Sequence, residues 1–181
     1  GTDVKRWRFR LDDNPVLSQE YKDRLKRLHT GLWYKRMVLG EWVQAEGAVY
    51  DMFDPDRHVV DVLPDMVEHW VGIDYGTTNP TVFLLVGQGT NDRLYVVDEW
   101  RWDSAARGRQ RTDAEYSRDL RAWLEGHEVI PRWVFYDPSA ASFGLQLWRD
   151  GLRGVTPADN EVLDGIRATA SLLAAGRLLI H

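Results

Sequence analysis

Val71-Gly-Ile-Asp74-Tyr-Gly-Thr-Thr-Asn-Pro80-Thr-Val-Phe-Leu-Leu85 is the stretch that decides the fold of this chain. An apolar run ends in one carboxylate, small and hydroxylated residues follow, and a second apolar run returns. This pattern predicts a strand, a tight turn and a partner strand, with Asp74 exposed where the first strand ends. An Asp in this position can serve a metal ion or a phosphate, but an ordinary turn Asp that caps backbone groups is the commoner case.

Composition limits what kind of protein this is. Of the 181 residues, 44% are hydrophobic and 28% are charged, which predicts a folded soluble domain. The sequence shows neither a long apolar run nor a signal peptide, so we expect an intracellular protein without a membrane partner. Because the chain has no cysteine, any metal ion has to be held by oxygen or histidine ligands.

The net charge of −5 argues against a uniformly basic surface, so nucleic-acid binding would need a local basic patch. Four arginines beside two tryptophans form such a patch: Arg101, Arg107, Arg109 and Arg111, next to Trp100 and Trp102. Arginines next to aromatic rings suit phosphate contact and base stacking. They are therefore candidate DNA-binding residues, with a merely solvated surface as the alternative.

The pattern of the chain changes near residue 65. Residues 1–65 contain two predicted helices, at 18–29 and 32–39, and an extended aromatic segment, which together suggest a linker or the tail of another domain. Residues 66–181 are rich in predicted strands, expected at 70–73, 81–86, 94–97, 133–136 and 154–156. Three helices are expected in the same region, one beginning at the capping box of Thr112 and Glu115 and the others at 140–148 and 161–173.

The fourth strand follows a helix, so it is expected to run parallel to one of the first three through a right-handed crossover. Three antiparallel strands, a helix, a parallel strand, a helix and a further strand form the ribonuclease H-like arrangement. The predicted fold is thus α/β, with a ribonuclease H-like mixed five-stranded sheet flanked by helices and preceded by a helical and extended linker segment.

Two carboxylates, Asp74 and Asp137, each follow an apolar strand directly and precede a turn. If those strands are parallel neighbours, the carboxylates emerge at one edge of the sheet about 5 Å apart. A divalent cation relieves the repulsion of such a pair, and oxygen ligands favour Mg²⁺ or Mn²⁺, which in pairs support phosphodiester hydrolysis. Asp137 followed by proline is alternatively a plain turn, and Glu99 is either a further ligand or a solvated edge residue.

Four motifs resemble the C-terminal nuclease domain of tailed-phage terminase large subunits: Gly72-Ile-Asp74-Tyr-Gly-Thr-Thr-Asn-Pro80-Thr, Leu94-Tyr-Val-Val-Asp-Glu-Trp100, Val134-Phe-Tyr-Asp137-Pro-Ser-Ala140 and Leu163-Asp-Gly-Ile166. Earlier segments resemble the connection between the packaging ATPase and that nuclease: Asp13-Asn-Pro15-Val-Leu-Ser18, Gly40-Glu-Trp-Val43 and Glu46-Gly47-Ala-Val-Tyr50. The resemblance covers nearly the whole chain. Its motifs are short, but their order and spacing are fairly specific.

The resemblance implies a DNA-packaging motor whose nuclease cuts concatemeric viral DNA with Mg²⁺ or Mn²⁺. Asp74 matches the family's first catalytic Asp, and Asp137 matches its second acidic ligand. The implied partners are double-stranded DNA, the ATPase domain in cis, the terminase small subunit and the portal protein. The implied location is the cytoplasm of a bacterial host, at the procapsid during packaging.

Two departures from the family pattern matter. The Gly-x-x-x-x-Gly-Lys-Ser/Thr phosphate loop of the ATPase does not occur in this sequence. The family's third acidic residue comes from a region beyond the strand that Arg177-Leu-Leu-Ile180 begins, and the sequence stops at His181. We therefore expect a piece of a longer protein, with an incomplete metal site and weak activity or none.

Two other functions remain open. Gly72-Ile-Asp74-Tyr-Gly-Thr-Thr-Asn79 also resembles the first phosphate loop of actin-like ATPases, such as the Hsp70 chaperones and sugar kinases. Those proteins need a second similar domain, whereas only about 100 residues follow Asp74. The other possibility is a catalytically silent fragment that docks on DNA, the motor domain or the portal.

Overall fold

The protein is represented by a computed structural model that describes residues 9–28, 34–40, 49–76 and 79–181. Contacts divide the chain into two units. The larger comprises Val59–Glu161 with Arg177–His181, and the smaller joins the described residues before Val59 to Val162–Gly176. The predicted boundary at residue 65 separates one linker from one domain, whereas contacts assign Val162–Gly176 to the same unit as the N-terminal residues.

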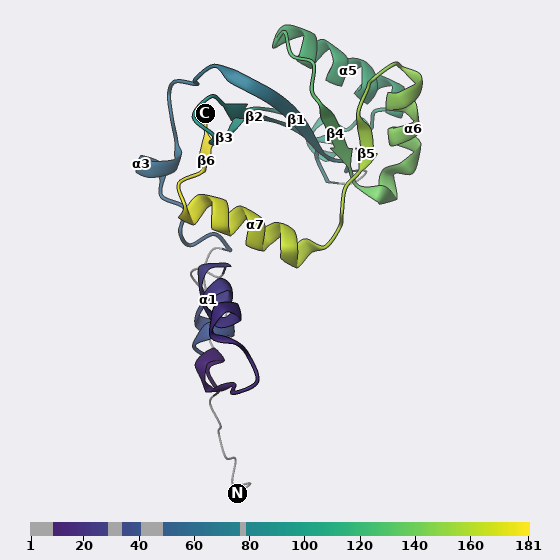
Figure 1. Cartoon of the computed structure of the whole chain (residues 1–181). Coiled ribbons are helices and arrows are strands. Elements are labelled where there is room, and N and C mark those ends of the chain that lie inside the picture. The colour runs from purple at the N-terminus through teal and green to yellow at the C-terminus, as the bar shows by residue number, and fades with distance from the viewer. Residues whose placement is uncertain (1–8, 29–33, 41–48, 77–78) are drawn as a thin grey trace, which may run out of the picture. The chain divides into compact units, whose positions relative to one another are not determined.

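The larger unit contains a mixed sheet (Figure 1). Its strands are β1 (Met66–Asp74), β2 (Thr81–Gly89), β3 (Leu94–Trp102), β4 (Trp133–Tyr136), β5 (Val155–Pro157) and β6 (Leu178–Ile180), in the order β5-β4-β1-β2-β3-β6. Strands β1 to β3 form the antiparallel meander, and β4 runs parallel to β1. The ribonuclease H-like α/β class is thereby confirmed, and β6, parallel to β3, adds the strand expected at 177–180 to the predicted five-stranded sheet.

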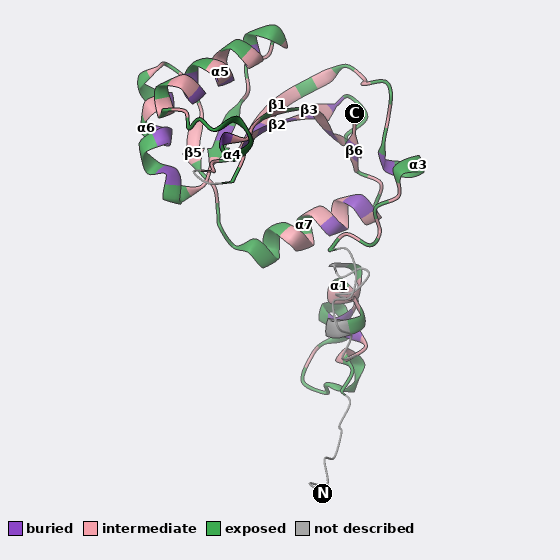
Figure 2. Cartoon of the chain, turned by 180° about the vertical axis from the view of Figure 1, so that it is seen from behind, coloured by how far each residue is buried: buried purple, intermediate pink, exposed green. Residues whose placement is uncertain are grey.

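Alternation along the strands sends successive side chains to opposite faces of the sheet. On β2, every second residue from Thr81 to Gly89 is buried. Helices α5 (Asp113–Gly126) and α6 (Ala141–Arg149) cover this face, with their buried residues turned toward the strands (Figures 1 and 2). The core contains Val71, Ile73, Phe83, Leu85, Tyr116, Leu120, Leu124, Val134, Ala140, Phe143 and Leu147. We call this the helix-covered face, and the other side the opposite face.

Helix α5 begins with the predicted capping box. The Thr112 hydroxyl accepts from the Glu115 backbone N–H at 3.3 Å, and the Glu115 carboxylate accepts from the Thr112 backbone N–H at 2.9 Å. These bonds satisfy donors that the first helical turn would otherwise leave unpaired. The apolar stripe of Tyr116, Leu120 and Leu124 then fixes the face that α5 buries.

The smaller unit is helical. Its elements are a 3₁₀ turn η1 (Leu11–Asp13), α1 (Gln19–Leu28), a π-helical turn η2 (Tyr34–Val38), α3 (Pro55–His58) and α7 (Val162–Ala174). Helix α1 corresponds to the helix predicted at 18–29, and residues 32–33 of the second predicted helix lie outside the described residues. The motif residues 41–48 lie outside them too.

His58, a residue that the sequence did not point to, links two parts of the smaller unit. Its Nδ1 lies 2.9 Å from both the backbone nitrogen and the carbonyl oxygen of Asp54, and its Nε2 donates to the Leu173 carbonyl at 2.8 Å. The side chain is fully buried. Both ring nitrogens of His58 are hydrogen-bonded, and the side chain thus joins α3 to α7.

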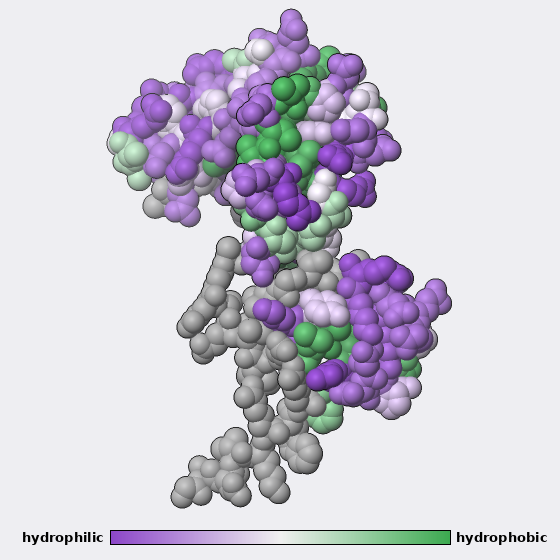
Figure 3. Space-filling model, turned by 90° about the vertical axis from the view of Figure 1, so that its left-hand side faces the viewer, coloured by the Kyte–Doolittle hydropathy of each residue, from purple (hydrophilic) through white to green (hydrophobic). Residues whose placement is uncertain are grey.

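The surface differs in character between the units. In Figure 3 the described N-terminal helices present mainly hydrophilic side chains, whereas the larger unit shows an apolar band on the face in view. Val59, Val62 and Val67 of the larger unit are exposed. No described helix is both long and apolar enough to cross a membrane.

Candidate functional site

Strands β1, β3, β4, β5 and β6 all run in the same direction, so their carboxyl ends lie at one edge of the sheet. Asp74 ends β1, Asp137 follows β4 directly, and Arg101 is the penultimate residue of β3. In open α/β sheets this edge is where ligands bind. The topology therefore gathers the two predicted ligands and the predicted basic patch at one edge.

Asp74 and Asp137 lie side by side in the register of the sheet. Ile73 pairs with Tyr136 in the parallel ladder of β1 and β4, so the next step along both strands brings the two aspartates together, about 5 Å apart by strand spacing. Ile73 is buried in the core, and the Tyr136 ring packs closely on Gly144 of α6. Alternation therefore directs both aspartates to the opposite face.

Asp137 is held at one carboxylate oxygen. It caps the 3₁₀ turn η3 (Pro138–Ala140), and its Oδ1 accepts from the Ser139 backbone N–H at 2.7 Å and from Asn160 Nδ2 at 3.2 Å. The bond from the Ser139 backbone, helped by Ser139 and Asn160 side chains, lowers the pKa of the Asp137 carboxyl. Asp137 is consequently ionised at neutral pH and presents an anionic Oδ2.

The turn after Asp74 is tightly folded. A side chain at Gly76 would collide with the carbonyls of Asn79 and Pro80, so glycine is required there. The Thr81 hydroxyl accepts from the Gly76 backbone N–H at 3.2 Å and donates to its carbonyl at 3.1 Å. Residues 77 and 78 lie outside the described residues.

Tyr75 ties this turn to α5. Its hydroxyl donates to Asp113 Oδ1 at 2.6 Å, and its ring packs against Tyr116 and Phe143 of the core. Burial, together with the hydrogen bond to Asp113, raises the pKa of the Tyr75 hydroxyl. Tyr75 thus remains a proton donor across the physiological pH range and anchors the residue that follows Asp74.

The chemistry of the pair suits a divalent cation. Two carboxylates about 5 Å apart repel by roughly 1–4 kcal/mol, depending on how much water screens them, and a cation between them removes that cost. The donors are hard carboxylate oxygens, the type that Mg²⁺ and Mn²⁺ prefer. Among the described residues, no cluster of three or more potential ligands surrounds a common point. The pair therefore fits part of a metal site.

Glu99, the further candidate ligand, lies elsewhere on the same face. It pairs with Leu84, which pairs with Gly72, so it stands two strands from β1, roughly 10 Å away by strand spacing. Asp98 points to the helix-covered face, where its Oδ2 accepts from Trp123 Nε1 and binds His127 Nε2, both at 2.8 Å. Register thus brings Asp74 and Asp137 together without Glu99.

The four candidate arginines have different surroundings. Arg101 lies within β3 on the opposite face, in the same cross-strand row as Asp74 through Val82, and its side chain is 57% exposed. Arg107 ends a short helix, α4 (Ser104–Arg107), with its guanidinium 4.5 Å from the Trp102 ring centre. Both groups are accessible to a phosphate.

Arg109 and Arg111 take part in the fold. Arg109 pairs with Glu115 of the capping box, although 63% of its side chain remains exposed. Arg111 pairs with Asp119, lies 3.6 Å from the Trp102 ring centre, and has only 17% of its side chain exposed. Burial lowers the pKa of the Arg111 guanidinium. Arg111 therefore anchors the segment that carries the other arginines.

Sequence reasoning did not identify three residues that shape this edge. Asn160 reaches Asp137 because the ladder of β4 and β5 extends to a bond from the Ala158 N–H to the Tyr136 carbonyl, 2.8 Å long. Asp113 and Asp119 receive Tyr75 and Arg111 from other elements. No local pattern predicts these pairings, since each depends on how the helices and strands are packed.

Comparisons with known structures agree with this architecture. The large terminase of a thermophilic bacteriophage, which we call the thermophile terminase, is 42% identical to this chain, with a TM-score of 0.79; the match covers 96% of this chain and 44% of the thermophile terminase. The same protein has also been solved with ADP. This chain thus spans less than half the length of that relative.

Two more distant structures share the fold. The nuclease domain of the P22 large terminase is 14% identical, with a TM-score of 0.55 over 75% of this chain and 72% of that domain. The large terminase nuclease of phage G20c, solved with bound zinc, is 18% identical, with a TM-score of 0.53 over 73% of this chain and 80% of that one.

No protein-family model and no curated protein sequence matches the chain. The assignment comes instead from the match to the thermophile terminase along nearly the whole chain and from the shared fold of two nuclease domains. The chain is therefore a phage large-terminase-like protein, and its sheet and helices form a fold like that of the terminase nuclease domain.

Proposed function

We propose that this chain is the nuclease part of a phage DNA-packaging terminase and that it cuts double-stranded viral DNA by metal-dependent hydrolysis. The observation that carries the proposal is the parallel register of β1 and β4, which sets Asp74 beside Asp137 on one face. The relation to the thermophile terminase supports the same role. The carboxylate pair and the match to the thermophile terminase favour a nuclease over an actin-like ATPase.

In this proposal the two aspartates bind the cation and the fold keeps them in place. Two divalent ions, when bound, activate water and stabilise the leaving oxygen of a phosphodiester. Asp74 is positioned by the Tyr75 anchor and the Gly76 turn, and Asp137 by its two hydrogen bonds. A third carboxylate, which the family resemblance places beyond His181, would complete the ligand set.

The accessible arginines would bind the DNA backbone beside the cutting site. Arg101 stands two strands from Asp74, roughly 10 Å away by strand spacing, a distance that corresponds to about three phosphates at 3.4 Å of axial rise. Arg107 offers an exposed guanidinium that already lies over the Trp102 ring. Phosphate contacts of this kind position DNA without reading its sequence.

For the whole protein we propose the partners of a packaging motor. The thermophile terminase is more than twice as long as the part matched here and has been solved with ADP. We accordingly propose an ATPase domain in cis, with the terminase small subunit and the portal protein as partners. Packaging would take place at the procapsid in the cytoplasm of the bacterial host.

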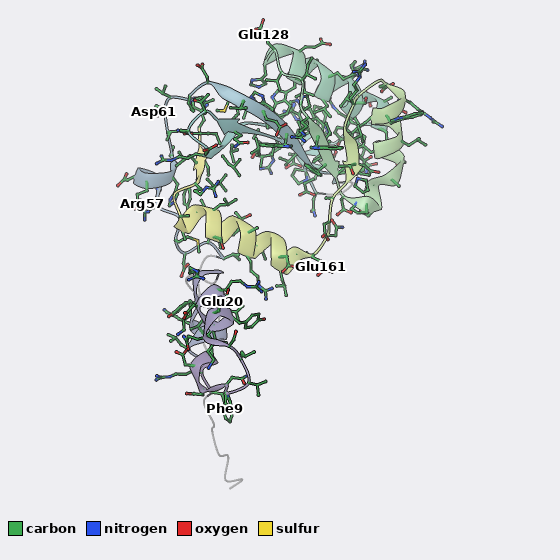
Figure 4. The ribbon with its side chains drawn as sticks, viewed as in Figure 1. Phe9, Glu20, Arg57, Asp61, Glu128 and Glu161 are labelled. Carbon is green, nitrogen blue, oxygen red and sulfur yellow. The ribbon has the colours of Figure 1, made fainter. Side chains whose placement is uncertain are left out.

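The test is nicking of supercoiled plasmid in Mn²⁺ or Mg²⁺ without ATP, by the longer protein that continues beyond His181. Asp74→Ala and Asp137→Ala should abolish nicking, and EDTA should do the same. Asp61→Ala is the matched control, because Asp61 is exposed in the segment before β1 (Figure 4). Full activity of Asp74→Ala would reject the proposal.

A comparison of this chain with the longer protein in the same assay separates an incomplete site from a silent one. If the third ligand lies beyond His181, the longer protein should cut faster than this chain. A longer protein that neither cuts DNA nor binds Mn²⁺ would identify the domain as a docking module.

A further inference from the structure

Asn160 lies beside Asp137 although 23 residues separate them. The backbone ladder of β4 and β5 ends with the bond from the Ala158 N–H to the Tyr136 carbonyl, and Asn160 follows two residues later. Its neighbour Glu161 is labelled in Figure 4, in the segment after β5. Because an ionised carboxylate only accepts hydrogen bonds, the amide nitrogen of Asn160 is the group that faces Asp137.

The Ser139 backbone N–H and the Asn160 amide donate to the same oxygen of Asp137. Oδ1 accepts from the Ser139 backbone N–H at 2.7 Å and from Asn160 Nδ2 at 3.2 Å. A carboxylate oxygen has two lone pairs, so these two donors occupy Oδ1 fully. Only Oδ2 of Asp137 is then available to a cation.

We propose that Asn160 is a positioning residue that restricts Asp137 to binding a divalent cation through Oδ2 alone. This inference rests on the proposed metal-dependent function. Mg²⁺ and Mn²⁺ favour compact octahedral sites, whereas Ca²⁺ accepts six to eight ligands and frequently binds both oxygens of a carboxylate. Asn160 therefore contributes to the choice between small and large cations.

The experiment measures Mn²⁺ and Ca²⁺ binding to this chain by calorimetry, in separate titrations without DNA. The variants are Asn160→Ala and Asp137→Ala. Asn91→Ala is the matched control, because Asn91 also uses its side chain in hydrogen bonds but lies in the turn between β2 and β3, at the other edge of the sheet. Thermal unfolding of each variant checks that it is folded.

The loss of Asn160 frees one lone pair on Oδ1. Loss of such an outer partner typically weakens metal binding about 10- to 100-fold, so the Mn²⁺ Kd should rise about tenfold. The Ca²⁺ Kd should change by less than about twofold, because Ca²⁺ can use the freed oxygen. Asn91→Ala should change neither value.

Two results would overturn the inference while leaving the metal site intact. One is an unchanged Mn²⁺ Kd in Asn160→Ala, and the other is an equal loss of Mn²⁺ and Ca²⁺ binding, the result expected of a general structural defect. In both cases Asp137→Ala would still abolish binding. If Asp137→Ala binds Mn²⁺ as the unaltered chain does, or the unaltered chain binds no Mn²⁺, the proposed metal site itself fails.

Discussion

The two faces of the sheet use alternate residues of the same strands for different purposes. On β4, Val134 faces the helices and is fully buried, whereas the next residue, Phe135, faces the other way and is 37% exposed. On β1, buried Ile73 is followed by exposed Asp74. One face therefore carries the core, and the other carries the carboxylates and Arg101.

Stability and the proposed chemistry are therefore separable at the level of single residues. A substitution on the helix-covered face should cost folding free energy, and one on the opposite face should cost metal or DNA binding. The division is a direct result of the two-residue period of a β-strand. Substitutions on both faces test it.

Asp74→Asn should give the largest effect. Loss of a charged ligand should reduce DNA nicking at least about a thousandfold, which corresponds to roughly 4 kcal/mol. The melting temperature should not fall, because the change removes repulsion with Asp137. Plasmid nicking and calorimetry on one preparation measure both effects. A large drop in melting temperature would mean that Asp74 also stabilises the fold.

Phe143→Ala and Phe135→Ala compare one residue type on the two faces. Phe143 is fully buried between the α5 and β2 aromatics, so its loss should cost about 3–4 kcal/mol of unfolding free energy. Phe135→Ala should cost about 1 kcal/mol or less, since its ring is already partly in water. Urea denaturation measures both, and equal losses would mean that the opposite face is equally packed.

Arg111→Met and Arg101→Ala test separately the arginine that stabilises the fold and the arginine that is exposed to DNA. Arg111→Met removes the pair with Asp119 and the contact with Trp102, and should cost about 2 kcal/mol of stability, between the values for exposed and buried ion pairs. Arg101→Ala should leave stability unchanged and reduce the salt dependence of DNA binding by about one unit of slope. A normal slope for Arg101→Ala would show that Arg101 is merely solvated.

Asp98→Asn should have the smallest effect, and one that depends on pH. Burial opposes ionisation of Asp98, but hydrogen bonds from Trp123 and His127 outweigh it and lower the pKa of its carboxyl below the unfolded value of 3.8. The stabilisation is therefore fully present above the unfolded pKa and is lost as the pH falls through the folded pKa.

Because Asp98 is partly solvent-exposed, the difference between the unaltered chain and Asp98→Asn should be about 1 kcal/mol at pH 7. It should shrink toward zero as the pH falls below the unfolded value of 3.8. Urea denaturation at several pH values measures the difference. A difference that stays constant across this range would contradict the assignment.

The sequence predicted the strands and the pairing of Asp74 with Asp137 because both depend on local signals. Apolar runs mark strands, the capping box marks the start of α5, and a helix between strands implies a parallel crossover. It did not predict Asn160 beside Asp137 or Arg111 on Asp119. Asn160 comes from a segment beyond the next strand, and Arg111 reaches from just before α5 to Asp119 within it. Neither contact has a spacing that a sequence pattern marks.

The predicted ends of strands and helices were wrong where tertiary contacts determine them. Strand β3 extends through Trp102, so Arg101 belongs to the sheet although the predicted strand ends at residue 97. The segment after β3 forms α4, capped by Asp103, whose side chain accepts from the Ala106 N–H. Cross-strand pairing with β2 lengthened the strand beyond its own apolar run.

The way the chain alternates between its two units limits where it can be cut or shortened. The backbone passes from one unit to the other after His58, after Glu161 and after Gly176. A single protease cut at any of these three connections releases neither unit. Each unit consists of two stretches of chain, and the contacts within a unit still hold its two stretches together. Neither unit can be expressed as one uninterrupted stretch of this sequence, and a shortened version would have to rejoin the ends on either side of the removed segment.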